Sequence, residues 1–249
     1  MTIAVVIPTL NEEQALPRTL CRTIGLGFDE IIVVDGGSND RTREIVSRFE
    51  VRRSKLQVAT SDLEPHTTPL AVLTSPSGRA RQMNRGAAEA NSDVLLFLHA
   101  DTLLPCEAKD AILSALRDPA CVGGRFDVRF DRDSRLSRVI GAMMNLRSRL
   151  TGIATGDQAI FVRKTVFERM GGYADIPLME DIDFTKRLRR MGRVAALSAT
   201  VVTSYRRWDL CGPVRTILLM WTLRLLYWLG IRPERLARFY AAVREPARG

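Results

Sequence analysis

Short apolar runs alternate with amphipathic stretches along the first 120 residues of the chain. Runs such as "IAVVI" (3–7) and "VLLFL" (94–98) are apolar at every position, which is typical of strands buried on both faces of a sheet. The stretches between them repeat their apolar residues with the period of a helix. The pattern predicts strands over 3–7, 30–35, 70–75 and 94–101, and helices over 12–24, 38–49, 78–90 and 105–118. Strands that alternate with helices indicate βαβ units and a mostly parallel sheet.

The pattern changes after residue 120. "GGRFDVRF" (123–130) alternates apolar with charged residues, as a half-exposed strand does. The later chain is predicted to form strands over 156–164 and 193–202, and helices over 134–150 and 179–192. The segment 51–69 has no clear period and is predicted to be a loop. The predicted fold class is α/β, with a mostly parallel sheet flanked by helices.

The C-terminal segment, residues 206–249, contains the strongly apolar stretch "VRTILLMWTLRLLYWLGI" (214–231), which is interrupted by Arg215 and Arg224. A helix that crosses a membrane needs about 20 mostly apolar residues, and an arginine at its centre costs roughly 2.5–3.5 kcal/mol. Two interpretations stay open: a helix docked on the domain, or a helix lying in the membrane interface. The sequence therefore predicts one large domain over 1–205 and a basic, apolar helical extension over 206–249 that is not a separate globular domain.

The chain carries a formal net charge of +9, and all but four of its 37 basic residues are arginine. Arginine binds phosphate in a bidentate fork, so the charge favours an anionic partner, namely a nucleotide, a nucleic acid or an acidic membrane surface. A coding bias toward arginine is the alternative explanation. Nine of the arginines lie within residues 206–249 against three acidic residues, which places much of the excess charge beside the most apolar helix.

Several classes of protein are disfavoured by missing motifs. The four cysteines form no C-x-x-C pair, so zinc ribbons and thioredoxin chemistry have no support. No G-x-G-x-x-G follows the first strand and no G-x-x-x-x-G-K-[ST] occurs, which argues against a dinucleotide dehydrogenase and a P-loop NTPase. The first residues resemble no signal peptide, so a cytoplasmic protein is expected.

Mostly polar residues stand at the end of each of the first four predicted strands or just after it. They are Pro8, Thr9, Asn11 and Glu12, then Asp35 and Gly36, then Arg79, Arg81 and Asn84, and finally His99 and Asp101. Ligands of open α/β sheets bind beyond the carboxyl ends of the strands, so these groups are expected to converge on a nucleotide.

Each group has a chemistry that suits such a site. Asp35 can accept hydrogen bonds from a base or ribose, and Arg79 or Arg81 can lie near the phosphates. Asp101 can hold Mg²⁺ or Mn²⁺, which often bind through one or two carboxylates plus substrate phosphates. The alternative is that Asp101 or Thr102 caps the helix predicted at 105.

Five segments in order carry a resemblance to a known family: "VVIPTLNEE", "IIVVDGGSNDRT", "FLHAD", "GDQAIFVRK" and "MEDIDFTKRLRRMG". Over about residues 3–208 they resemble the family 2 inverting glycosyltransferases of the GT-A fold. "GRARQMN", "FLHADT" and "TSYRRW" are similar to a small bacterial subgroup of that family. The resemblance implies a GT-A domain with a C-terminal helical extension.

The resemblance also implies roles for single residues. Pro8, Asn11 and Glu12 would form the first nucleotide-contacting loop, Asp35 would read the base, usually uracil, with Gly36 beside it, and Arg81 and Asn84 would meet the nucleotide. Asp101 matches the metal ligand of the family's D-x-D, whereas His99 stands in place of its first Asp and would either contact the ribose or metal or leave that contact weak. Asp181 matches the catalytic base, with Glu180 beside it.

Two further groups are predicted to bind the donor sugar or the acceptor: Gly156, Asp157 and Gln158, and then Arg206, Arg207 and Trp208. "YRRW" (205–208) lacks the Gln of the Q-x-x-R-W of processive members, so polymer synthesis is not expected.

The expected function is the metal-dependent, inverting transfer of a sugar from a nucleotide-sugar, a UDP-sugar above all, to an acceptor hydroxyl. The basic apolar extension favours a lipid-linked acceptor and peripheral contact with the inner face of the cell membrane. The alternatives are a sugar nucleotidyltransferase and a non-catalytic relative that binds nucleotide or nucleic acid. A nucleic-acid partner is not expected, because no zinc, helix-turn-helix or aromatic RNA-binding signature is present.

Overall fold

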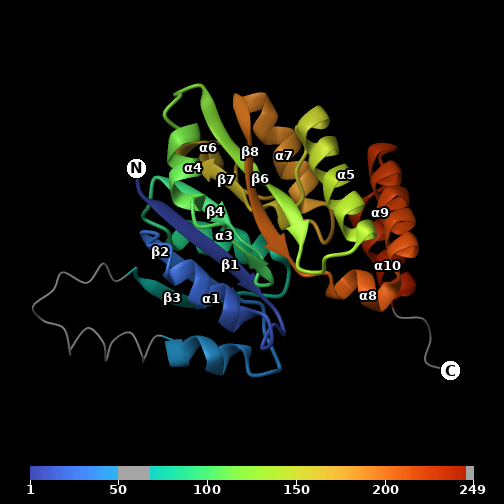
Figure 1. Ribbon diagram of the computed structural model, residues 1–249, viewed down its shortest axis with the longest axis horizontal. Helices are drawn as coiled ribbons and strands as arrows, with labels where there is room; N and C mark the ends of the chain where they lie inside the picture. Colours follow the sequence, from blue (N-terminus) through green and yellow to red (C-terminus); the bar gives the residue numbers. More distant parts are fainter. Residues whose placement is uncertain (50–67, 245–249) are drawn as a thin grey trace, which may run out of the picture.

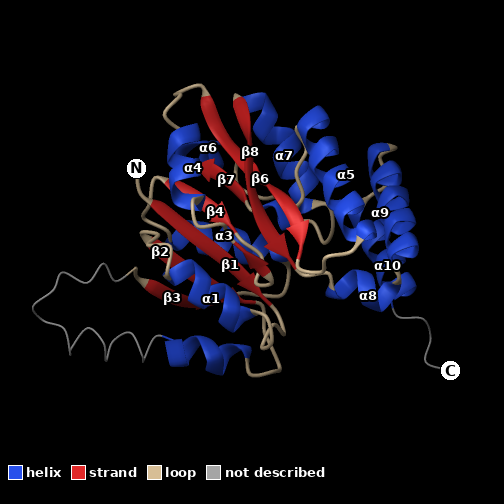
Figure 2. Cartoon of the chain, in the orientation of Figure 1, coloured by secondary structure: helices blue, strands red, loops and turns tan. Residues whose placement is uncertain are grey.

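The computed structural model describes residues 1–49 and 68–244 and is built on one eight-stranded sheet with helices on both faces (Figures 1 and 2). The strands are β1 (Ile3–Thr9), β2 (Glu30–Asp35), β3 (Leu70–Thr74), β4 (Val94–Phe97), β5 (Thr102–Leu103), β6 (Cys121–Phe130), β7 (Ile160–Arg163) and β8 (Arg193–Thr203). The helices are α1 (Leu16–Ile24), an unlabelled helix over 42–49, α3 (Arg79–Glu89), α4 (Ala108–Ala115), α5 (Arg135–Thr151), α6 (Lys164–Arg169), α7 (Glu180–Met191), α8 (Arg206–Cys211), α9 (Pro213–Trp228) and α10 (Pro233–Arg244), with a 3₁₀ turn η1 (Gly156–Gln158). Most of the predicted loop 51–69 lies outside the described residues.

The strand order is β3-β2-β1-β4-β7-β6-β8-β5, and four of the seven strand pairs are parallel. β1 is parallel to β2 and β4, and β2 is parallel to β3, with Thr9 opposite Asp35 and Asp35 opposite Thr74. The first four strands predicted by the sequence therefore end at one edge of the sheet. The predicted α/β fold with a mostly parallel, helix-flanked sheet is confirmed.

The two faces of β1 explain why its apolar run is continuous. Val5 and Ile7 belong to a buried cluster with Leu16 and Leu20 of α1, whereas Val6 on the opposite face belongs to a cluster that includes residues of α3 and α7. Successive side chains of a strand point to opposite faces, so burial on both sides requires an apolar residue at every position. The sheet is thus held between two apolar layers, and its carboxyl edge is left to the polar loops.

Two predicted strands are shorter than expected. β4 ends at Phe97, because the chain turns back where the N–H of Thr102 donates to the carbonyl of His99 (3.1 Å). His99 and Asp101 therefore lie in a loop, and the alternation of a strand does not orient them. The predicted strand over 156–164 is also wrong at its start, since residues 156–158 form η1 and only β7 pairs with β4 and β6.

Three expected helix starts also differ, and the first is that of α1, which begins at Leu16 and not at residue 12. α4 begins at Ala108 with Glu107 at its N-cap and no side-chain cap, so the alternative in which Asp101 or Thr102 caps this helix is wrong. The helix predicted from residue 38 is helical only from residue 42, where Asp40 accepts a hydrogen bond from the N–H of Thr42 (2.9 Å). An aspartate at this position satisfies a backbone donor that the first turn leaves unpaired.

The C-terminal helices pack on the domain beside α5 (Figure 1). Leu223 of α9 and Leu236 of α10 share a buried cluster with Met179, the residue before α7. α9 is apolar around its circumference, yet only Thr216 and Leu223 are buried. Within residues 1–49 and 68–244, no helix combines the length and the apolar content needed to cross a membrane.

Candidate functional site

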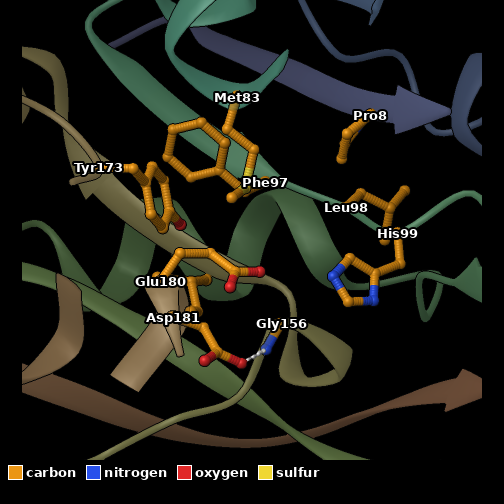
Figure 3. A pocket seen from close by; sticks show the side chains of 10 residues that line it. Pro8, Met83, Phe97, Leu98, His99, Gly156, Tyr173, Glu180 and Asp181 are labelled. Atoms are coloured by element: carbon orange, nitrogen blue, oxygen red, sulfur yellow. Dashed lines mark hydrogen bonds between the residues drawn. The ribbon is translucent and has the colours of Figure 1, made fainter. Parts of the chain in front are cut away.

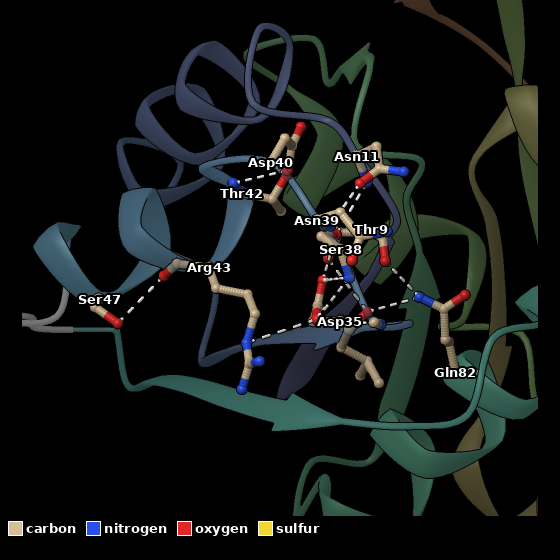
Figure 4. Close-up of polar contacts among 12 residues, drawn as sticks. Thr9, Asn11, Asp35, Ser38, Asn39, Asp40, Thr42, Arg43, Ser47 and Gln82 are labelled. Atoms are coloured by element: carbon tan, nitrogen blue, oxygen red, sulfur yellow. Dashed lines mark hydrogen bonds and ion pairs between the residues drawn. The ribbon is translucent and has the colours of Figure 1, made fainter.

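Asp35 at the end of β2 is the centre of a polar cluster (Figure 4). Its carboxylate is 2% exposed and accepts hydrogen bonds from the N–H groups of Gly37 (3.1 Å) and Ser38 (3.2 Å) and from the Ser38 hydroxyl. Arg43 Nε lies 3.7 Å from it. The loop therefore fixes Asp35 in place before any ligand arrives.

The loop after β1 is tied to the same cluster. Asn11 adopts a left-handed backbone conformation (φ 55°), its N–H donates to Ser38 Oγ, and its side-chain oxygen accepts from the N–H of Asn39 (both 2.9 Å). The N–H of Glu12 donates to Thr42 Oγ1 (2.9 Å). Asparagine tolerates this conformation better than most residues, so "PTLNEE" and "DGGSND" form one rigid pair of loops.

Gln82 is a residue that the sequence analysis missed. It is 3% exposed on α3, and its Nε2 donates to the carbonyls of Thr9 (2.7 Å) and Val34 (2.8 Å), which end β1 and β2 (Figure 4). A Cβ on Gly36 would lie 3.0 Å from the Gln82 amide, so the glycine leaves room for this contact. The run "GRARQMN" contains Gln82, but only the tertiary structure shows what its amide binds.

His99 and Asp157 join the loop after β4 to η1. Nδ1 of His99 lies 3.1 Å from Oδ1 of Asp157. Burial opposes ionisation of Asp157, but the hydrogen bond and the charge of His99, with Arg207 and Arg79, lower the pKa of Asp157 well below its usual range. His99 therefore holds a second carboxylate near the position where the family pattern has its first aspartate.

Asp101 is half-buried, and no described residue donates a hydrogen bond to its carboxylate. Among residues 1–49 and 68–244, no three His, Cys, Asp or Glu side chains gather closely enough to hold a metal ion. Mg²⁺ and Mn²⁺ need only one or two carboxylates when a substrate diphosphate supplies other oxygens. The free lone pairs of Asp101 fit such an ion, which would be completed by the substrate.

The start of α7 carries two neighbouring carboxylates. Met179 precedes it in a left-handed conformation (φ 69°), which is uncommon for a residue with a side chain and marks a position that the surroundings enforce. Asp181 Oδ2 accepts a hydrogen bond from the N–H of Gly156 (2.9 Å), and its Oδ1 accepts from Ile182 (2.7 Å). Asp181 is therefore held by η1 on one side and by its own helix on the other.

Glu180 and Asp181 line a small cavity that His99 also lines (Figure 3). Glu180 is 7% exposed, and burial followed by the charge of Asp181 raises its pKa, against the opposing charge of Arg79. Tyr173 lines the same cavity, and its buried hydroxyl has no hydrogen-bond partner. The hydroxyl is thus an unpaired polar group at the cavity, and the sequence analysis did not foresee Tyr173.

Arg79 at the start of α3 is a cation on which the acidic groups of the site act. Although burial acts in the opposite direction, the carboxylates of Glu180, Asp157, Asp181 and Asp101 raise the pKa of Arg79. Of the two arginines predicted near the phosphates, Arg79 is therefore the one that lies among the site carboxylates.

Three predicted contacts are engaged elsewhere in the fold. Arg81 pairs with Asp175 on the surface (2.8 Å). Asn84 binds the backbone of Tyr173 through both ends of its amide (2.8 and 2.9 Å). Gln158 is wholly buried and donates to Ser148 Oγ (3.0 Å), so its side chain fixes η1 to α5. Their roles in binding stay predictions.

The segment 206–208 approaches the site from the C-terminal side. Arg206 Nη2 lies 3.0 Å from Glu12 Oε2, and the charge of Arg207 acts on Asp157. Trp208 instead packs on Tyr205 and Phe130, with ring centroids 6.0 and 5.5 Å apart. Pro8 at the end of β1 lines the cavity with His99. The structure thus gathers most of the predicted residues at one edge of the sheet, while Trp208 serves an apolar cluster.

The chain is similar to known proteins in sequence and in structure. A model of the family "Glycosyl transferase family 2" matches residues 4–171. The chain is 28% identical over 210 residues to the probable glycosyltransferase YdaM of Bacillus subtilis (strain 168), covering 76% of this chain and 47% of YdaM. It is 35% identical over 172 residues to the undecaprenyl-phosphate 4-deoxy-4-formamido-L-arabinose transferase of Pectobacterium atrosepticum, covering 65% and 47%. The chain spans about half the length of these relatives.

Solved structures share the fold at low identity. S. aureus TarS 1–349 superimposes with a TM-score of 0.62 at 19% identity, covering 82% of this chain and 60% of TarS. The mannosyltransferase PcManGT from Pyrobaculum calidifontis, solved with GDP-Man and Mn²⁺, gives a TM-score of 0.60 at 20% identity and covers 97% and 69%. These likenesses confirm a GT-A-like fold. Since the family model matches more than half of the residues, the chain belongs to glycosyl transferase family 2.

Proposed function

We propose that this protein transfers a sugar from a nucleotide-sugar to an acceptor hydroxyl with inversion, in a metal-dependent reaction. One observation carries the proposal: Glu180 and Asp181 line the same cavity as His99, beside the carboxyl edge on which Asp35 and Asp101 also lie. A nucleotide at Asp35 and a base at Asp181 would leave the anomeric carbon between them.

The donor is proposed to be a UDP-sugar. TarS was solved with UDP and with UDP-GlcNAc, and PcManGT with GDP-Man and Mn²⁺. Asp35, with Gly36 and the loop of Asn11, is the proposed contact of base and ribose, while Arg79 is the proposed contact of the phosphates. A divalent ion bound at Asp101 would supply positive charge to the departing diphosphate.

The proposed reaction at the acceptor depends on Asp181. Its carboxylate removes the proton from the acceptor hydroxyl as that oxygen attacks the anomeric carbon from the side opposite the diphosphate, so an α-linked donor gives a β-linked product. The hydrogen bond from the N–H of Gly156 orients the carboxylate.

The finer assignments of the sequence analysis stand as proposals. The chain is assigned to the small subgroup with the "FLHAD" motif, and residues 1–205 act as the catalytic domain with 206–249 as its extension. The acceptor is proposed to be lipid-linked, which the name of the Pectobacterium atrosepticum relative supports.

Two exposed apolar stripes support peripheral contact with a membrane. Five large side chains of α9 recur at helical spacing and are at least 56% exposed: Val214, Leu218, Trp221, Leu225 and Trp228. Five more follow one face of α5: Leu136, Val139, Met143, Leu146 and Leu150. α5 and α9 share an apolar cluster and carry six arginines with no acidic residue between them. Apolar faces with basic flanks suit an anionic bilayer.

The donor site is tested by thermal shift against nucleoside diphosphates, with and without Mn²⁺. At a concentration about 100 times Kd, a ligand stabilises by roughly 2.7 kcal/mol, which for a domain of this size raises the Tm by about 5–10 °C. We expect a Mn²⁺-dependent rise with UDP that Asp101→Ala abolishes. No rise in Tm with any nucleotide would rule out the proposed donor site. Release of pyrophosphate from a nucleoside triphosphate would instead identify a nucleotidyltransferase.

Membrane contact is tested by co-sedimentation with vesicles of phosphatidylglycerol and phosphatidylcholine, with pure phosphatidylcholine as control. We expect binding to the anionic vesicles that weakens at 1 M salt, because the Debye length falls from about 10 Å at 0.1 M to about 3 Å. The double replacement Trp221→Glu and Leu225→Glu is expected to abolish binding. Equal binding by this variant would show that α9 does not face the bilayer.

A further inference from the structure

Arg147 on α5 is half-buried, and two of the three nitrogens of its guanidinium are buried without a hydrogen-bond partner. Its Nε and Nη2 are inaccessible to solvent and make no hydrogen bond. An arginine cannot give up its charge in a protein, so these donors stay charged and unsatisfied. An unpaired buried donor costs roughly 1–3 kcal/mol and more when it is charged, which makes this placement unfavourable in the absence of a ligand.

Neighbouring arginines of α5 are satisfied. Arg138 Nε lies 2.7 Å from Asp133, and Arg149 Nη2 lies 2.6 Å from Asp127. Arg147 therefore differs from them in that no described carboxylate forms a hydrogen bond with its guanidinium.

The position of Arg147 is on the acceptor side of the site. The next residue, Ser148, accepts a hydrogen bond from Gln158 of η1 (3.0 Å), so this turn of α5 lies against η1. The charges of Asp181 and Asp157 act on the Arg147 guanidinium. α5 packs on β6, which β7 and β4 separate from the strands β1 and β2 of the predicted nucleotide loops.

The donor phosphates have other cations available. Arg79 at the start of α3 lies among the carboxylates near Asp101, and Arg207 acts on Asp157. A negative field from Glu180, Asp181 and Asp157 would repel an anionic acceptor unless a cation on the acceptor side offset it. Arg147 is a cation placed for that purpose.

We propose that Arg147 binds an anionic phosphate group of the acceptor next to Asp181. The assignment rests on the proposed transferase function and narrows its acceptor to an amphiphile with a phosphate. The exposed Leu146 and Leu150 flank Arg147 in sequence and offer an apolar surface near its headgroup. The edge formed by Nη2 and Nε suits bidentate binding of phosphate oxygens once the groups that cover it move aside.

The experiment is titration calorimetry of farnesyl phosphate and of farnesol into wild type, Arg147→Gln, Arg147→Lys and the control Arg138→Gln. We expect Arg147→Gln to weaken the binding of farnesyl phosphate about 10- to 100-fold, as for the loss of a charged hydrogen bond. The affinity for farnesol should change little. Arg147→Lys should recover part of the affinity, and Arg138→Gln should behave as wild type. Equal affinity of wild type and Arg147→Gln for farnesyl phosphate, or no binding to wild type, would overturn the proposal.

A second arm uses UDP with Mn²⁺ on the same proteins. UDP affinity unchanged in Arg147→Gln is expected, and it keeps the result apart from a failure of the donor site. If Arg147→Gln binds UDP more weakly but binds farnesyl phosphate as wild type does, Arg147 binds the donor diphosphate. That result would overturn the acceptor assignment. The Tm gives an independent readout: Arg147→Met is expected to raise it, because an unsatisfied buried charge is removed, and a fall would show that Arg147 serves the fold.

Discussion

Replacement of Asp181 by Asn is expected to lower the rate of sugar transfer by about 10²–10⁴-fold, the usual contribution of a general base. The amide keeps the shape of the side chain and can still accept the hydrogen bond from the N–H of Gly156, but it cannot take a proton. Transfer is measured as release of nucleoside diphosphate that depends on acceptor, and donor affinity is measured separately by thermal shift. The donor affinity should be unchanged.

Two isosteric variants serve as controls. Asp183→Asn lies in the same helical turn, where Asp183 pairs with Arg187 (2.7 Å), and it should leave transfer nearly unchanged. Glu180→Gln tests the neighbouring carboxylate. If Asp183→Asn lowers transfer as much as Asp181→Asn, the effect belongs to the helix and not to a base.

A pH dependence of stability follows from the raised pKa of Glu180. Because folding raises this pKa, the contribution of Glu180 to stability is present at low pH and is lost as the pH rises through its folded value. Glu180→Gln is therefore expected to raise the Tm at neutral pH and to have little effect near pH 4.

An Asp181→Asn variant that keeps transfer within tenfold of wild type would contradict the base assignment and indicate an acceptor oxygen that is already ionised, such as that of a phosphate.

Replacement of Gly156 by Ala is expected to reduce transfer by about 10²-fold with the fold intact. A Cβ at this position would lie 2.2 Å from Nε2 of His99, so the imidazole has to move. His99 is hydrogen-bonded to Asp157, and the N–H of Gly156 binds Asp181, so the added methyl group displaces both the loop of His99 and Asp101 and the carboxylate of Asp181. Misplacement of a reacting group by about 1 Å can cost this much in rate.

A double-mutant cycle separates this mechanism from general damage. His99→Ala removes the clash, so Gly156→Ala should cost much less in that background than in wild type. Gly25→Ala is the matched control, since a Cβ there meets only ordinary contacts at 3.5 Å or more. Additive losses in the cycle would show that Gly156 acts independently of His99.

Most of the fold could be predicted from the sequence because its signals are local. The all-apolar runs of β1, β2 and β4 and the amphipathic α3 and α7 each reveal an element by its own period, and parallel pairing then gathers their ends at one edge. The errors are at element ends, where β4 stops at Phe97 and η1 replaces the start of a strand. η1 is held by a hydrogen bond to the distant Asp181, and β4 stops at a local turn closed by Thr102 and His99 that the apolar run does not reveal.

The site was predictable only in part, for the same reason. Asp35 ends β2, Asp101 lies in the loop after β4, and Asp181 lies in the first turn of α7, so sequence position suggests them. Gln82 and Arg147 look like ordinary helix residues, and only tertiary structure shows that one amide joins two strands and one guanidinium lacks a partner. The bond between His99 and Asp157 joins positions 58 residues apart and has no local signal.

The packing of the C-terminal helices on Met179 limits how far the chain can be shortened from its C-terminal side. Leu223 and Leu236 cover the side chain of the residue whose left-handed backbone starts α7, so the position of the acidic pair depends on helices that follow the sheet in sequence. A chain shortened after residue 205 would lose more than a surface for lipids. It would expose Met179 to water and release the constraint on α7. The shortest fragment that keeps the start of α7 in place therefore has to extend beyond β8.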